Sequence, residues 1–266
     1  MTVELPPVVE VRRVSKRFET RRQDTLALDD ISLAVRDGEF LCIVGPSGCG
    51  KSTLLNIIAG FDQPDAGEVW AAGKPVRKPG RDRVVVFQEP ALFPWLNVRS
   101  NVEFGLRLSG KGRGERRALA GDYLRLVGLE RFENAFIHEL SGGMKQRVQL
   151  ARSLAVDPRV LLMDEPFAAL DAQTRDVLQE ELQSVWQRTG KTILFVTHNV
   201  REAVLLADRV IVMSRSPGRV KREVRISLPH PRDPDSHAIV DLAAAIRDEL
   251  RDPVLLANVP GERYAI

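Results

Sequence analysis

The segment at residues 45–53 restricts the fold of this 266-residue chain more than any other feature. It matches the pattern G-x-x-x-x-G-K-[S/T], in which the glycines, the lysine and the hydroxyl residue are fixed. The apolar run Phe40–Val44 before it predicts a strand covered on both faces, and Ser52–Ala59 after it predicts a helix. A strand, a glycine-rich turn and a helix in this order predict a phosphate-binding loop in an α/β protein.

Each residue type in this loop has a role in holding a triphosphate. Glycines let the backbone curl so that successive N–H groups point at phosphate oxygens, and the start of the helix adds unpaired donors. Lys51 adds a positive charge for the β- and γ-phosphates, and the Ser52 hydroxyl is a ligand for Mg2+. ATP and Mg2+ are therefore the expected ligands. The residues expected to contact them here are Gly45, Pro46, Ser47, Gly48, Cys49, Gly50, Lys51, Ser52 and Thr53.

A second apolar run, Val160–Met163, ends in two carboxylates. It predicts a buried strand with Asp164 at its end, where the carboxylate can hold Mg2+ directly or through water. Glu165 follows by one residue, where it can orient or deprotonate an attacking water. Adjacent carboxylates after an apolar run are common by chance. The pair indicates a metal and catalytic site only because the chain also contains the phosphate loop.

The other apolar runs extend the same sheet and leave a gap in the middle of the chain. Because the runs alternate with helical patterns, they predict a mainly parallel sheet. Between about residues 90 and 156 no strand pattern occurs, which predicts a helical insertion. The expected strands are Val8–Val14, at an edge, Ile31–Val35, Val84–Val86, Thr192–Val196 and Val210–Met213. The expected helices are Val102–Leu108, Glu115–Val127, one that begins near Ser141, and Asp171–Arg188, which Gly190 ends.

The C-terminal part of the chain contains a turn, a linker and one more helix. Ser216–Gly218 predicts a turn between two strands, and the polar, proline-rich segment His230–Pro234 predicts a linker. Ser236–Arg251 then predicts a terminal helix.

Composition narrows the class of protein. Apolar residues make up 44% of the chain and charged residues 28%, and no apolar run approaches the roughly 18 residues that cross a bilayer. The N-terminus lacks the basic and apolar regions of a secretory signal, so we expect a cytoplasmic protein whose membrane role comes through a partner. Cys42 and Cys49 have no companion cluster, which favours a reducing compartment without a disulfide or a bound metal.

A formal net charge of +3 indicates little about partners. The arginine-rich stretches Arg12–Arg13, Arg21–Arg22 and Arg113–Arg117 favour solvated surface, and the alternative is attraction to acidic lipid head groups. No nucleic-acid motif accompanies the charge, so we expect no nucleic-acid partner.

The segment Leu140–Arg147, Leu-Ser-Gly-Gly-Met-Lys-Gln-Arg, distinguishes between classes of ATPase. Ser141 is a good N-cap and Gly142 and Gly143 free the backbone, so the segment predicts a second helix start that can bind an anion. The segment resembles the signature sequence of ATP-binding cassette (ABC) proteins, with Met144 where the family usually has glutamine. The resemblance implies a head-to-tail dimer in which Ser141, Gly142, Gly143 and Gln146 contact the ATP held by the other protomer.

Further elements of the ABC family follow in order along the chain. By resemblance, Phe18 stacks on adenine, and Gln88 contacts Mg2+ and water and senses the membrane subunit. Asp171, in Ala169–Asp171, lies in the loop that crosses the dimer interface, and His198 contacts the γ-phosphate. The resemblance implies Glu165, His198, Lys51 and Gln88 as catalytic residues, and Ser52, Gln88 and Asp164 as metal ligands.

The resemblance also implies an architecture. It covers about residues 8–228 and implies a P-loop NTPase (RecA-like) core with a mainly parallel sheet, an antiparallel β subdomain and a helical subdomain at about 90–156. Residues 229–266 form a C-terminal extension that contains the terminal helix.

A finer resemblance concerns the importers of the nitrate, sulfonate and taurine group. It rests on Val86–Leu96, Glu202–Arg209 and Ser216–Arg219. It implies a separate transmembrane permease and an extracytoplasmic solute-binding protein. The ABC resemblance itself implies a second ATP-binding subunit, for which we expect a homodimer although the sequence leaves a heterodimer open, and a place on the cytoplasmic face of the plasma (inner) membrane. Phe93, Pro94 and Trp95 then form either an exposed groove that receives the permease or local packing of the helical insertion.

Three alternatives compete with an ABC transport ATPase. A soluble ABC ATPase acting on DNA or ribosomes has a long coiled coil or a second cassette, whereas this chain has one phosphate loop and no heptad run. A P-loop kinase does not account for Leu140–Arg147. A non-hydrolysing ATP-binding regulator does not account for Lys51, Asp164, Glu165 and His198 together.

Overall fold

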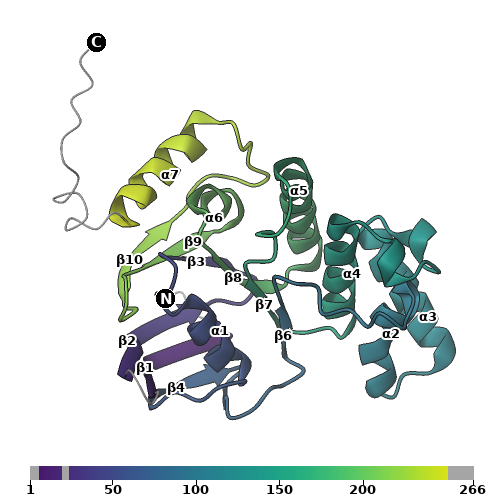
Figure 1. Ribbon diagram of the computed structural model, residues 1–266, viewed down its shortest axis with the longest axis horizontal. Helices are drawn as coiled ribbons and strands as arrows, with labels where there is room; N and C mark the ends of the chain where they lie inside the picture. The colour runs from purple at the N-terminus through teal and green to yellow at the C-terminus, as the bar shows by residue number, and fades with distance from the viewer. Residues whose placement is uncertain (1–5, 20–23, 251–266) are drawn as a thin grey trace, which may run out of the picture.

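The computed structural model describes residues 6–19 and 24–250, and they form two sheets with helices between and around them (Figure 1). The larger sheet has six strands in the order β10-β9-β3-β8-β7-β6. Five of them are parallel and β10 is antiparallel to β9, which confirms the α/β class. The strands are β3 (Phe40–Val44), β6 (Arg83–Val86), β7 (Val160–Asp164), β8 (Thr192–Thr197), β9 (Arg209–Met213) and β10 (Val220–Arg225).

Strand β3 lies inside this sheet and is buried over its whole length, as its apolar run predicts. Phe40, Cys42 and Val44 pack into a cluster on one face, and Leu41 and Ile43 pack into a cluster on the other. Both cysteines are free and buried.

The smaller sheet is antiparallel, with the order β2-β1-β4-β5. Its strands are β1 (Val9–Glu19), β2 (Asp24–Val35), β4 (Ala66–Ala71) and β5 (Lys74–Pro75). The expectation that the first strand lies at an edge is wrong, because β1 pairs with both β2 and β4. The sequence pattern missed β4, in which Gly67 has a φ of 80° and a Cβ added there would lie 2.2 Å from the Arg13 carbonyl oxygen.

Helices cover both faces of the six-stranded sheet (Figure 1). Helix α1 (Lys51–Ala59) lies between the two sheets and contacts β4 and β7. Helices α5 (Ala172–Thr189) and α6 (Val200–Leu206) pack in the cluster on the opposite face, together with α7 (His237–Leu250). Gly190 ends α5 in a left-handed conformation with a φ of 60°, as predicted.

A lobe of helices lies beside the sheets (Figure 1). It consists of α2 (Val98–Leu108), α3 (Arg113–Leu126), α4 (Gly142–Ala155) and two short 3-10 turns, η1 (Glu130–Phe132) and η2 (Ile137–Glu139). These helices share an apolar cluster of their own, to which Val102, Leu124 and Val148 contribute fully buried side chains. No strand interrupts residues 90–156, as their pattern predicts.

The segment before α7 is packed rather than free, which differs from the expected linker. Arg232 is only 7% exposed, and its guanidinium donates hydrogen bonds to the carbonyls of five residues: Val204, Leu205, Ala207, Ile226 and Leu228. His230 contacts Trp186 edge-on and lies 3.3 Å from Asp208. The polar, proline-rich composition did not indicate this packing, because most of the partners lie more than 20 residues away in sequence. The part of the expected extension at 251–266 lies outside the described residues.

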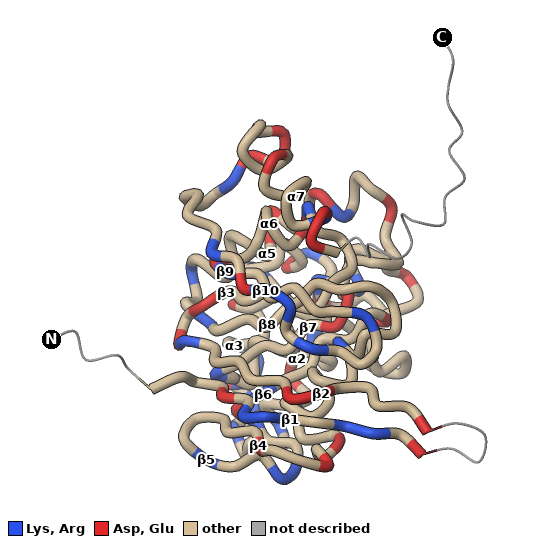
Figure 2. Tube along the Cα trace, turned by 90° about the vertical axis from the view of Figure 1, so that its left-hand side faces the viewer, with Lys and Arg blue, Asp and Glu red and all other residues tan. Residues whose placement is uncertain are grey.

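The basic stretch Arg12–Arg13 forms ion pairs on the surface. Arg12 pairs with Glu10 and Glu68, and Arg13 pairs with Asp30. Figure 2 shows the basic residues of β1 beside acidic residues of its neighbours. The pair Arg21–Arg22 lies outside the described residues. Within residues 6–19 and 24–250, no helix has the length and apolar character needed to cross a membrane.

The network around Arg232 predicts a large loss of stability when its side chain is removed. Arg232→Ala leaves several buried carbonyls without donors, so we expect the free energy of unfolding to fall by about 3 kcal/mol. Urea unfolding followed by circular dichroism measures this. Arg225→Ala, at an exposed position of β10, is the matched control and should change the midpoint little. Equal midpoints for the two variants would contradict the structural role.

Candidate functional site

The predicted phosphate loop connects β3 to α1. Two of its residues adopt the left-handed conformation that glycine permits, Gly48 with a φ of 78° and Gly50 with a φ of 91°. A Cβ at Gly50 would lie 2.8 Å from the carbonyl oxygen of Ala27 and 2.6 Å from a methyl of Leu28. The first helical hydrogen bond runs from Leu54 N to Gly50 O at 2.9 Å, so the N–H groups before it have no helical partner. The loop therefore offers curled backbone donors at a helix start, which suits an anion.

Lys51 is buried inside this loop, with 6% of the residue exposed. Its Nζ donates to the carbonyl oxygens of Gly45 at 2.8 Å and Pro46 at 3.2 Å. These contacts hold the ammonium group within the curled backbone. Its positive charge has no carboxylate partner among these contacts, so it is available to phosphate oxygens.

Ser52 and Asp164 meet in front of the loop. The hydroxyl of Ser52, on the first turn of α1, donates to Asp164 Oδ1 at 3.0 Å, and Asp164 ends β7. Burial raises the pKa of Asp164, the hydrogen bond from Ser52 opposes this, and the neighbouring Glu165 charge adds to it. The two side chains thus share one position although 112 residues separate them.

This donor set fits Mg2+. A hydroxyl and one carboxylate are hard oxygen ligands, and Mg2+ commonly takes its remaining ligands from water and substrate phosphates. In the described part of the chain no group of three or more His, Cys, Asp and Glu side chains could hold a metal alone. Gln88, the third expected ligand, follows β6 by two residues and is exposed.

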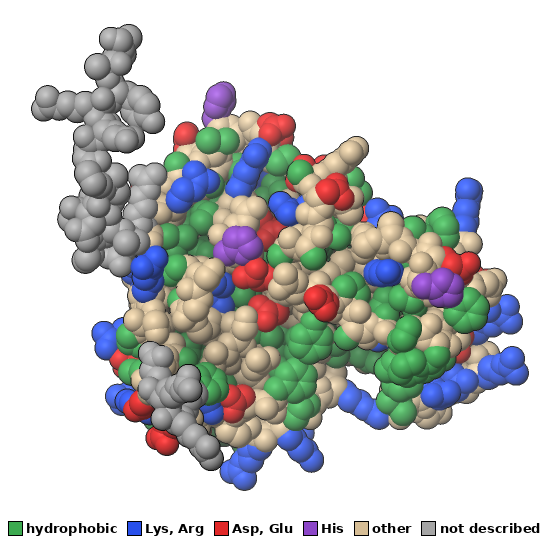
Figure 3. All heavy atoms as spheres, in the orientation of Figure 1, with side chains coloured by type: hydrophobic (Ala, Val, Ile, Leu, Met, Phe, Trp, Pro, Cys, Tyr) green, Lys and Arg blue, Asp and Glu red, His purple; other side chains and the backbone are tan. Residues whose placement is uncertain are grey.

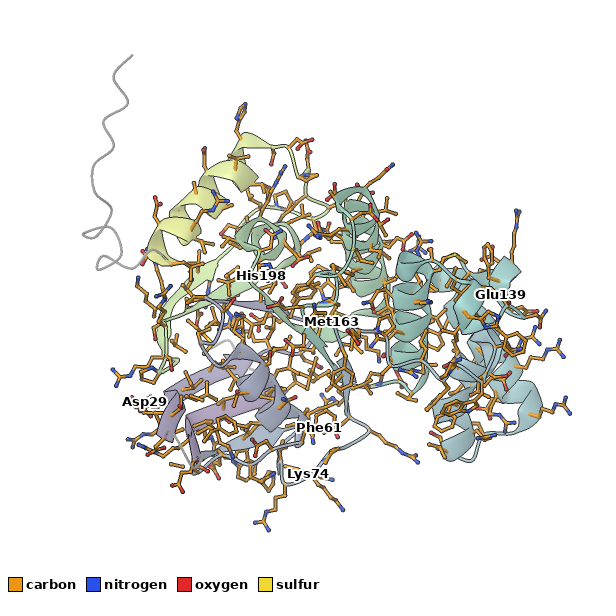
Figure 4. All side chains as sticks on the ribbon, in the orientation of Figure 1. Asp29, Phe61, Lys74, Glu139, Met163 and His198 are labelled. Atoms are coloured by element: carbon orange, nitrogen blue, oxygen red, sulfur yellow. The ribbon has the colours of Figure 1, made fainter. Side chains whose placement is uncertain are left out.

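Glu165 and His198 form the other part of the site. Glu165 Oε2 lies 2.8 Å from His198 Nδ1, and an ionised carboxylate only accepts, so Nδ1 carries the hydrogen in this contact. Glu165 has a φ of 45°, which is uncommon for a residue with a side chain, and its N–H donates to Val196 O at 2.9 Å. Strained backbone of this kind is frequent at functional sites. Figure 4 shows His198 over the six-stranded sheet.

The signature segment forms a helix start, but away from this cluster. Ser141 is the N-cap of α4 and accepts a hydrogen bond from Met144 N at 3.3 Å, as predicted. A Cβ at Gly143 would lie 2.6 Å from a methyl of Thr174, so glycine permits the close approach of α4 and α5. Ser141, Gly143 and Met144 help to line a hollow of about 430 Å³ beside α5. Among the described residues, no hydrogen bond joins Ser141 to the phosphate loop.

Two further predicted residues are exposed. Asp171 is the N-cap of α5, and the hydrogen bonds it accepts from Thr174 lower its pKa. Phe18 is 42% exposed on β1, where the ammonium of Lys16 lies 5.4 Å from its ring centre. Both positions leave the side chains accessible to a ligand.

Gln146 differs from the expectation that it contacts a nucleotide. It is 5% exposed, and its amide donates to the carbonyl oxygens of Gln88 at 2.8 Å and Pro166 at 2.7 Å. A side chain buried in this way has no face open to a ligand, so we correct its role to joining two loops of the site. The motif alone did not indicate this, because both partners lie far from Gln146 in sequence.

Glu202 and Asn199 both hydrogen-bond to Thr197, the residue before His198, and the sequence pattern missed both. Glu202 is 5% exposed, accepts hydrogen bonds from Thr197 Oγ1 and Gln179 Nε2, and has a pKa raised by burial. Asn199 caps α6 and donates its N–H to Thr197 Oγ1 at 3.0 Å. In the sequence, Asn199 directly after His198 is a signal for the start of a helix, because asparagine is a common N-cap.

Comparison with known protein families and sequences gives consistent matches. The profile of a family described as ABC transporter matches residues 28–168. An uncharacterized ABC transporter ATP-binding protein of Methanocaldococcus jannaschii is 52% identical over 93% of this chain and 92% of its own length. A nitrate import ATP-binding protein of Synechocystis sp. is 52% identical over 83% of each chain. A taurine import ATP-binding protein of Burkholderia pseudomallei is 54% identical over 79% of this chain and 80% of its own length.

A solved structure shares the fold. A dimeric ATP-binding cassette in a post-hydrolysis state, bound to ADP and phosphate, superposes with a TM-score of 0.72 at 35% identity. The match covers 83% of this chain and all of that one.

The geometry of the phosphate loop predicts that Lys51 carries much of the affinity for a triphosphate. Charge-assisted hydrogen bonds contribute about 1.5–3 kcal/mol, so Lys51→Ala should raise the dissociation constant for ATP about tenfold or more. Titration with a fluorescent ATP analogue measures it. Lys74→Ala is the control, since Lys74 is exposed and lies far from His198 in Figure 4. Wild-type affinity in Lys51→Ala would refute the assignment of the loop.

Proposed function

This chain belongs to the ABC transporter family as an ATP-binding, ATP-hydrolysing subunit, and we propose that it energises uptake of a small solute of the nitrate, sulfonate or taurine type through a separate membrane permease. ATP binding and hydrolysis follow from membership of the family. The solute class rests on relatives whose names specify nitrate and taurine import.

One observation carries the proposal for the site. The ends of β3, β7 and β8, which are neighbours in the sheet, bring together three units: Lys51 in its loop, the pair Ser52–Asp164, and the pair Glu165–His198. Binding groups for a triphosphate, a cation site and a candidate base therefore meet at one edge. A P-loop kinase would need an acceptor site instead of the signature helix at Ser141.

We infer a sequence of events from these side chains. The curled backbone and Lys51 bind the phosphates, and the Ser52 hydroxyl, the Asp164 carboxylate and Gln88 would hold Mg2+. When bound, Mg2+ neutralises charge on the phosphate oxygens. Glu165 orients water for in-line attack on the γ-phosphate and accepts its proton, and His198 holds Glu165 and the transferred group in place.

A second copy of the chain completes the site in this proposal. Ser141 is exposed at the start of α4 and lies away from the phosphate loop of its own chain, as does the exposed Asp171. A head-to-tail homodimer would bring each signature helix to the ATP of the other protomer. The dimeric arrangement of the related cassette supports this.

An aromatic surface is the proposed docking site for the permease. Phe61 and Phe87 stack with ring centres 6.3 Å apart and are 53% and 39% exposed, and Trp95 is 72% exposed. Figure 3 shows apolar side chains gathered between the smaller sheet and the helical lobe. Phe93 instead packs between Trp95 and Phe104, so the cluster at Phe93–Trp95 combines local packing with exposure.

The proposed assembly places this subunit on the cytoplasmic face of the plasma (inner) membrane. An extracytoplasmic solute-binding protein delivers the solute to the permease and does not touch this chain. To test the solute class, the permease and the binding protein are purified with this subunit. Nitrate, sulfonates and taurine are then screened for an upward shift in the melting temperature of the binding protein. A shift with an unrelated solute alone would exclude the proposed class.

The role of Glu165 predicts a separation of binding from hydrolysis. Glu165→Gln keeps the size of the side chain but removes its basicity, so ATP should still bind while kcat falls about a hundredfold or more. Phosphate release measures kcat, and size-exclusion chromatography with ATP measures a dimer that accumulates because hydrolysis no longer opens it. Glu180→Gln, at an exposed position of α5, is the control. Normal turnover in Glu165→Gln would show that another group activates the water.

A further inference from the structure

Two segments that are far apart in sequence pack against residues 48–50 of the phosphate loop. They are residues 27–29 of β2 and the turn 216–219 between β9 and β10. Gly218 N donates to Ala27 O, and Asp29 N donates to Gly218 O, both at 2.9 Å. The turn is thus bonded to the smaller sheet although it arises from the larger one. The mechanism proposed above gives this turn no role.

Gly218 is the point where the turn reaches the loop. A Cβ built there would lie 2.0 Å from the carbonyl oxygen of Cys49, 2.8 Å from Met213 Cε and 3.2 Å from Ala27 O. Gly218 is buried, and no left-handed φ requires glycine at this position. The reason for glycine is therefore the close approach of the Cys49 carbonyl.

This contact sets the orientation of one peptide group in the loop. In a planar trans peptide the carbonyl of Cys49 and the N–H of Gly50 point in opposite directions. Because the Cys49 oxygen faces Gly218, the Gly50 N–H points away from it, toward the other side of the loop. Gly50 itself is held against Ala27 and Leu28, so the peptide has little room to rotate.

The turn is held in place by polar contacts of its own. Ser214 Oγ accepts from Arg219 N at 3.0 Å and donates to Pro217 O at 3.0 Å. Arg219 Nε donates to Asp29 Oδ2 at 2.8 Å. Asp29 lies on β2 at the edge of the molecule in Figure 4. Arg219 is exposed and Asp29 is partly buried, so the ion pair contributes to the position of the turn more than to stability.

We propose that Gly218 is a positioning residue for nucleotide binding: its missing side chain admits the Cys49 carbonyl, and this aims the Gly50 N–H at the phosphates. The inference rests on the proposed function of the loop as an ATP site. Gly218 itself touches no nucleotide and acts through the backbone of Cys49 and Gly50.

Gly218→Ala tests this in the full-length chain. The added methyl displaces the Cys49–Gly50 peptide, so we expect the dissociation constants for ATP and ADP to rise about fivefold or more. The KM for ATP should rise by a similar factor, whereas kcat at saturating ATP should change less than twofold because Glu165 and His198 are untouched. Gly121→Ala on α3 is the matched control, since a Cβ there meets nothing within 4 Å and its φ is not left-handed.

The outcomes separate the inference from alternatives. Equal ATP affinities for Gly218→Ala and Gly121→Ala would overturn it, even if Gly218→Ala had a lower melting temperature. Such a result would leave the turn a merely structural role. Failure of the wild-type chain to bind ATP would instead refute the proposed function.

A second variant decides the case if Gly218→Ala does not fold. Arg219→Ala adds no atoms near the loop but releases the turn from Asp29, so a rise of about two- to threefold in the ATP dissociation constant is expected. Arg219→Lys, which retains the charge, should restore most of the affinity. Unchanged affinity in Arg219→Ala would overturn the inference.

Discussion

The parallel pairing of three strands is the interaction on which the site depends. Val44 of β3 pairs with Thr197 of β8, and Val196 of β8 pairs with Asp164 of β7. The three strands therefore end within one residue of each other, and the residues that follow them leave the sheet at the same edge. A slip of one residue would turn every side chain of the shifted strand to the opposite face of the sheet. Burial of β3 on both faces makes such a slip costly, so the core fixes the geometry of the site.

Several groups near this edge lower the stability of the fold. Asp164 and Glu202 are carboxyl groups whose pKa values burial raises. A raised folded-state pKa stabilises the fold below the ordinary pKa of the group, and this contribution disappears as pH rises through the folded-state value. Near neutral pH these two groups therefore oppose folding. The left-handed backbone of Glu165 adds strain of about 1–3 kcal/mol at the same place.

The parts of the molecule that the sequence predicted are those set by local pattern. Residues 40–44 and 160–164 are continuous apolar runs, and a capping serine and a terminating glycine marked the limits of α4 and α5. The sequence motifs also predicted Lys51, Ser52, Asp164 and Glu165 as site residues, and the family resemblance implied His198; the structure brings these five residues to one edge. The sequence did not predict features set by distant partners. These include the central place of β1, strand β4, the buried Arg232 and the internal role of Gln146. Each depends on contacts between residues that are 20 or more positions apart in the sequence.

Helix α4 connects the signature segment to the aromatic surface through two buried amides. Gln146 donates to the carbonyls of Gln88 and Pro166. In the amide orientation that satisfies its neighbours, Gln149 accepts from Phe87 N at 2.9 Å and donates to Phe87 O at 3.3 Å. The backbone of Phe87 and Gln88 is thus bonded to the helix that Ser141 begins. Because Phe87 is half-exposed beside Phe61, a shift of α4 against the six-stranded sheet would move part of the proposed docking surface. The same shift would act on Pro166, one residue after Glu165. A single helix therefore connects the proposed dimer contact, the candidate base and the surface proposed for the permease. All of these contacts lie within this chain.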